Sequence, residues 1–101
     1  MNELLNWLLL QKGGIRTYLE FQNRALDLRA SEPEHAALLR LLADLAGRFA
    51  EAYDGEPLSV DVAERALGQL SALLEKAIAP GAIGPAEQLA LLNEIGQAEL
   101  V

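Results

Sequence analysis

The chain is poor in histidine and cysteine, the side chains that most often bind transition metals or act as a base or nucleophile. His35 is the only histidine and cysteine is absent, so thiolate metal sites, disulfides and cysteine nucleophiles are excluded. No second metal ligand lies four residues before or after His35, the spacing that places two ligands on one face of a helix. We therefore interpret His35 as a first-turn residue of a helix, and we expect no metal ion and no other cofactor.

Two pairs of carboxylates have the spacing for acid–base chemistry. These pairs are Glu32 with Glu34 and Asp61 with Glu64. Both fall where helices are expected to begin, and acidic residues in a first turn interact favourably with the helix dipole. A structural role therefore explains them better than catalysis.

The glycine pair and the serines indicate no catalytic site either. Gly13-Gly14 before a helix has the character of a phosphate-binding turn, but it lacks the wider fingerprint of such loops. Ser31 and Ser59 are placed to cap helices, and no general base is specified near Ser71. The sequence predicts no catalytic and no cofactor-binding residue, and hence a protein that is not an enzyme.

The most unusual stretch is the apolar segment at residues 3–12, "ELLNWLLLQK". A secretory signal needs a basic start and a small-residue cleavage site, whereas Glu3 precedes this run and Lys12 follows it. A membrane span needs about 20 apolar residues, and this run ends after seven, interrupted by Asn6. A short helix remains, with Asn2 as its expected N-cap.

The composition predicts an all-α protein. Leu and Ala together number 39, while Val, Ile and Thr together number 8, so strong helix formers dominate and β-formers are scarce. At 101 residues the chain forms one domain, residues 1–101. We expect a small bundle of four to five helices built on a central antiparallel αα-hairpin. The expected helices cover residues 2–12, 16–30, 32–54, 59–79 and 85–96, of which 32–54 and 59–79 form the hairpin.

The boundaries follow from local signals. Ser31 and Glu34 have the spacing of a capping box, and Ser59 is the expected cap of the fourth helix. Pro85 suits the first position of the last helix, which bears the apolar residues Leu89, Leu92 and Ile95. One alternative stays open, because residues 15–21 also alternate as a strand would and 58–62 could pair with them.

The charge is negative and unevenly placed. The net charge of −7 argues against binding of duplex nucleic acid. Residues 1–30 carry four basic and three acidic groups, whereas residues 31–101 carry four basic and twelve acidic groups. The excess of Arg over Lys, with abundant Ala, Leu and Gly, suggests a bacterial source, and the absence of Cys fits a cytoplasmic location.

The first helix supplies the functional hypothesis. Its large apolar residues spread around most of the helix circumference, so packing on one face covers about half of them. Each uncovered side chain forgoes roughly 1.5–3 kcal/mol of burial, and exposed apolar surface of that size marks an association site. The predicted interface residues are Leu4, Leu5, Trp7, Leu8, Leu9 and Leu10.

We therefore expect a non-enzymatic protein–protein interaction module, a dimeric helical adaptor, regulator or chaperone-like factor. The expected partner is protein, in the first place a second copy of this chain, without nucleic acid or membrane span. Two alternatives remain. One is an acidic decoy or inhibitor that binds a basic partner, and the other is a helical bundle with a ligand-binding or catalytic site between its helices.

Overall fold

A computed structural model describes residues 1–12, 14–78 and 84–100, of which 79% are helical. Five α-helices and one short 3-10 helix occur among these residues, and no strand does. The prediction of an all-α bundle is confirmed, and the two-stranded alternative for residues 15–21 is wrong. The helices are α1 (Asn2–Leu9), α2 (Ile15–Leu28), the 3-10 helix Pro33–His35, α3 (Ala36–Ala52), α4 (Val60–Ile78) and α5 (Pro85–Gln97).

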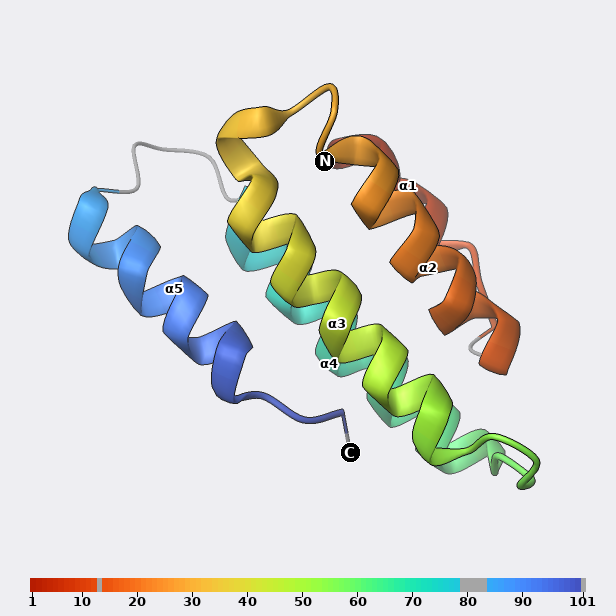
Figure 1. The fold of residues 1–101 in the computed structure, drawn as a ribbon. Helices are drawn as coiled ribbons and strands as arrows, with labels where there is room; N and C mark the ends of the chain where they lie inside the picture. Colours follow the sequence, from red (N-terminus) through yellow and green to blue (C-terminus); the bar gives the residue numbers. More distant parts are fainter. Residues whose placement is uncertain (13, 79–83, 101) are drawn as a thin grey trace.

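The helices form two layers (Figure 1). α2, α3 and α5 lie side by side in the nearer layer, and α1 and α4 lie behind α2 and α3. α3 and α4 form the expected antiparallel hairpin, and the chain reverses between them near Gly55, whose φ of 74° lies in the left-handed region. The most extensive helix–helix contact joins α2 to α3, so the second helix is as central to the core as the hairpin.

Aromatic side chains fasten α2 to the hairpin. The ring of Tyr18 on α2 lies 4.6 Å from that of Phe49 on α3, and Phe49 lies 5.0 Å from Tyr53. Tyr18 is fully buried, and its hydroxyl donates a hydrogen bond of 3.0 Å to the carbonyl of Ala63 on α4. One side chain of α2 therefore contacts both arms of the hairpin. Residues 15–21 belong to a helix because Tyr18, Phe21 and Ala25, which recur at helical spacing, are all buried on one side of it.

The helix starts show which local signals were reliable. Ser59 caps α4, because its Oγ accepts a hydrogen bond of 3.2 Å from the amide of Val62. Pro85 occupies the first turn of α5, as predicted. The capping box at Ser31 and Glu34 is wrong, since the Ser31 hydroxyl donates to the carbonyl of Leu28 at the end of α2. The cap at Asn2 is also wrong, because α1 begins at Asn2 itself.

The observed bounds correct the predicted ones by a few residues. α1 and α2 end earlier than expected, at Leu9 and Leu28. The predicted helix 32–54 is divided into the 3-10 turn and α3, because the backbone of Glu32 (φ −127°, ψ 64°) and of His35 (φ −109°, ψ 15°) is not α-helical. Residues 13, 79–83 and 101, among them the predicted last residue of the helix 59–79, lie outside the described part of the chain.

α5 is the least buried of the five helices. Ile95 is its only fully covered large residue, and Leu89 is 59% exposed. Leu89 is directed to solvent, whereas Leu92 packs against the core and Ile95 is part of it. Within the described residues no helix is both long and apolar enough to cross a membrane.

Candidate functional site

The apolar residues of α1 divide by the side of the helix on which they lie. α1 packs between α2 and α4, and this contact buries Leu4 and Leu8, one helical turn apart. Leu5 and Trp7 flank the contact and are half-buried. Leu4 and Leu8 are therefore core residues in this chain, and they offer no surface to a partner.

The outward side of α1 is apolar and exposed. Leu9 is 56% exposed, and Leu10, the residue after the last turn, is 80% exposed. The packing of α1 on α2 and α4 that buries Leu4 and Leu8 leaves both of these leucines largely exposed. Of the six predicted interface residues, the structure leaves these two freely accessible and two more at the edge.

Trp7 is shielded by a cation. The guanidinium of Arg24 on α2 lies 4.5 Å from the centre of the indole ring, within the range of a cation–π interaction. Arg24 also binds the carboxylate of Glu20 at 3.0 Å, which fixes its position over the ring. Trp7 is therefore part of the α1–α2 contact.

A shallow apolar groove runs beside Leu9 between α1 and α4. Its lining includes two acidic residues, Glu64 and Glu75, and three small residues of α4. The residues that line it are Leu9, Glu64, Leu67, Gly68, Ser71, Ala72 and Glu75. The exposed side of α1 and the outer face of α4 thus form one continuous surface, which we call the α1–α4 face.

The described residues also bring one group of potential metal ligands together, around the 3-10 turn. A carboxylate oxygen of Glu32 lies 3.1 Å from Nδ1 of His35, and Glu34 contributes a third atom. The other oxygen of Glu32 accepts a hydrogen bond of 2.7 Å from the amino group of Met1. Because the ligand oxygens of Glu32 already face two nitrogen groups, the arrangement serves as a clasp between α1 and the turn before α3.

The clasp affects the ionisation of Glu32. The hydrogen bond from the Met1 amino group lowers the pKa of the Glu32 carboxyl below its usual value, and the His35 hydrogen bond adds to this effect against partial burial. Glu32 therefore stabilises the fold in its ionised form. That stability is present above the ordinary glutamate pKa and is lost as the pH falls through the lowered value.

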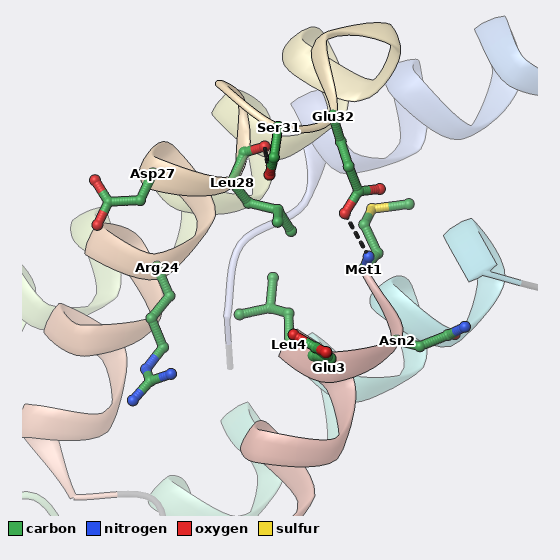
Figure 2. Close-up of a pocket in the computed structure, with 9 residues that line it drawn as sticks. All are labelled: Met1, Asn2, Glu3, Leu4, Arg24, Asp27, Leu28, Ser31 and Glu32. Atoms are coloured by element: carbon green, nitrogen blue, oxygen red, sulfur yellow. Dashed lines mark hydrogen bonds and ion pairs between the residues drawn. The ribbon is translucent and has the colours of Figure 1, made fainter.

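Figure 2 shows the open pocket next to this clasp, between α1 and α2. Met1 and Glu32 meet at one end, whereas the side chains of Arg24 and Asp27 lie along α2 at the other. Ser31, the only hydroxyl residue in the lining, donates to the Leu28 carbonyl and not to His35. The pocket therefore holds charged groups without a paired nucleophile and base.

Two features of the site were missed in the sequence. The Glu32–His35 contact has i, i+3 spacing, and the small residues Gly68 and Ala72 have i, i+4 spacing. Both signals are readable in the sequence, and the capping-box interpretation hid the first. The contact between Met1 and Glu32 joins residues 31 apart and has no sequence signal.

Comparison with protein-family models, with curated proteins and with solved structures finds no match to this chain.

Proposed function

We propose that this protein acts by binding protein, with a second copy of itself as its first partner, through the α1–α4 face. The observation that carries the proposal is the pair of exposed leucines at the end of α1, Leu9 and Leu10, beside an apolar groove. Solvent-exposed leucines next to apolar surface favour association, because their burial removes apolar area from water.

The magnitude is sufficient for association only if the groove takes part. Burying both leucines contributes roughly 2–4 kcal/mol per subunit, and twice that in a symmetric pair. A micromolar dissociation constant corresponds to about 8 kcal/mol after the cost of association is met. The interface therefore needs further contact area, and the groove adjoining Leu9 is the nearest apolar surface that can supply it.

A pair of charge substitutions tests the proposal. Leu9→Glu and Leu10→Glu each place a carboxylate in the contact. We therefore expect each substitution to raise the dissociation constant of the dimer, measured by light scattering, at least tenfold. The matched control is Leu89→Glu, because Leu89 on α5 is exposed to almost the same extent as Leu9. All three chains should keep the helical circular dichroism of the parent.

The results separate cleanly. Loss of the dimer in the two α1 variants, with retention in the α5 variant, supports an interface at α1. A dimer that survives both α1 substitutions, or a parent protein that is monomeric throughout, would contradict the proposal.

A further inference from the structure

The exposed face of α4 has an unusual centre. Gly68 and Ala72 lie one turn apart on it, about 40° from each other around the helix axis. A Cβ atom added at Gly68 would meet nothing within 4 Å, so no neighbour within the described chain requires a glycine there. Glycine inside a helix costs about 1 kcal/mol relative to alanine. A glycine with this cost and no internal contact fits the close approach of another backbone from outside.

Ser71 gives a second, independent sign of a partner in the same groove. Ser71 is 8% exposed as a whole residue and lines the groove, yet its hydroxyl makes no hydrogen bond to any described residue. The hydroxyl is not sealed in the core, because no side-chain oxygen in the described residues is both fully buried and unpaired. It therefore opens to the groove, where a second molecule can supply its partner.

Charged residues border this centre on both sides, with opposite signs. Glu64 and Glu75 lie about 20° apart around the axis and form an acidic edge on the side of α1, where they line the groove with Leu9. Arg65 and Lys76 form a basic edge on the other side, and Lys76 reaches α5 through an ion pair of 2.7 Å with Glu94.

The symmetry of a dimer follows from these two edges. If two α4 helices pair in parallel about a twofold axis along their length, the acidic edge of each faces the basic edge of the other. If they pair antiparallel, rotation places acidic edge against acidic edge and basic against basic. The first arrangement brings the two Asp61 carboxylates together at the centre of the face, where each keeps its own Arg65 at 3.3 Å, but it gives opposite charges along both edges. The second arrangement gives like charges along both edges and is therefore disfavoured.

We propose that two copies of this chain pair through α4 in parallel, with Gly68 and Ala72 at the centre of the contact. Glu64 then pairs with the partner subunit's Arg65, and Glu75 pairs with the partner subunit's Lys76. Leu9 extends the apolar part of the contact on the side of the acidic edge. This inference rests on the proposed function and names the surface and orientation through which the chain self-associates.

The required change of ion pairs is small. Glu64 and Glu75 make no ion pair with any described residue. Arg65 contacts Asp61 at 3.3 Å, and Lys76 contacts Glu94, but these groups are all more than 40% exposed. Exposed ion pairs of this kind contribute about 0–1 kcal/mol, so their exchange for intersubunit pairs costs little.

A larger side chain at Gly68 tests whether the surface around Gly68 and Ala72 forms the contact between the two copies. Gly68→Leu improves helix propensity, and its Cβ meets nothing within 4 Å, so the fold should be as stable as the parent or more so. The leucine side chain would lie between the two α4 helices of the dimer, so the dissociation constant of the dimer should rise at least tenfold. Gly96→Leu is the matched control, because Gly96 on α5 has equally open surroundings. It should leave the dimer unchanged.

A single cysteine tests the orientation, because the chain has none of its own. Asp61 lies at the centre of the same face, and Asp61→Cys in a parallel pair places two thiols beside each other. In an antiparallel pair centred between Gly68 and Ala72 the two positions are about 27 Å apart. A short bifunctional maleimide should therefore give a covalent dimer of Asp61→Cys in high yield and little of Leu89→Cys.

Each outcome has a distinct meaning. Dissociation by Gly68→Leu together with cross-linking at residue 61 supports the parallel α4 pair. A dimer that is insensitive to Gly68→Leu but lost in Leu9→Glu overturns this inference and leaves the proposed function standing. A dimer without cross-linking at residue 61 overturns the orientation, and a parent chain that stays monomeric overturns both proposals.

Discussion

At the scale of single residues, Tyr18 illustrates how one polar atom is accommodated in an apolar core. Its ring fills space between α2 and α3, and its hydroxyl finds the Ala63 carbonyl on α4. Burial raises the pKa of Tyr18 to about 12, because the tyrosinate would lose its hydration. The residue therefore couples stability to alkaline pH.

Substitution of Tyr18 by phenylalanine tests this coupling. Tyr18→Phe removes one buried hydrogen bond and should lower the free energy of unfolding by about 1 kcal/mol at neutral pH. Because the folded-state pKa is raised, the contribution of Tyr18 is full below pH 10 and is lost as the pH rises toward 12. Urea unfolding across this range should show the gap between parent and variant closing. Equal destabilisation by Tyr53→Phe, whose ring is half-exposed, would contradict this account.

At the scale of helices, local signals were predictable and the surroundings of each helix were not. Ser59 and Pro85 act as the sequence indicates, because an N-cap and a first-turn proline depend only on neighbouring residues. Ser31 has the same local pattern, but its hydroxyl completes the end of α2 and a 3-10 turn follows. Whether the Ser31 hydroxyl completes the end of α2 or caps the next helix depends on how the two helix ends meet in the fold. The spacing of residues in the sequence does not show this.

The cap of α4 gives a prediction at this scale. Ser59→Ala removes the hydrogen bond to the amide of Val62 and should destabilise the protein by about 1 kcal/mol, seen as a lower melting temperature. Ser31→Ala is the control, because Ser31 is exposed and donates only to a terminal carbonyl, so its effect should be within about 0.5 kcal/mol. Equal effects of the two substitutions would show that Ser59 is not a specific cap.

The candidate site was predicted in part for the same reason. The apolar character of residues 4–10 is local, and so is the inference that one packing face cannot cover them all. Which of them face inward depends on how α1 packs on both α2 and α4, an arrangement of the whole fold. Leu4 and Leu8 were therefore assigned to a surface although they lie in the core, and the outer face of α4 was not recognised.

At the scale of the whole molecule, the uneven charge and the exposed apolar surface meet on one face. The outer side of α4 carries the opposed charged edges, and the exposed end of α1 adjoins the acidic one. Charge alone gives orientation and apolar burial gives affinity, so the two should respond differently to salt. The dimer should weaken modestly as salt screens the edges and should persist through its apolar part.

The most direct test of the central claim is sedimentation equilibrium of the unmodified protein over a range of micromolar concentrations. Self-association through the α1–α4 face predicts a reversible monomer–dimer equilibrium with a dissociation constant on the order of micromolar. The fitted mass should approach twice that of the single chain as concentration rises. A single species with the mass of one chain, unchanged up to the highest concentration, would contradict the claim.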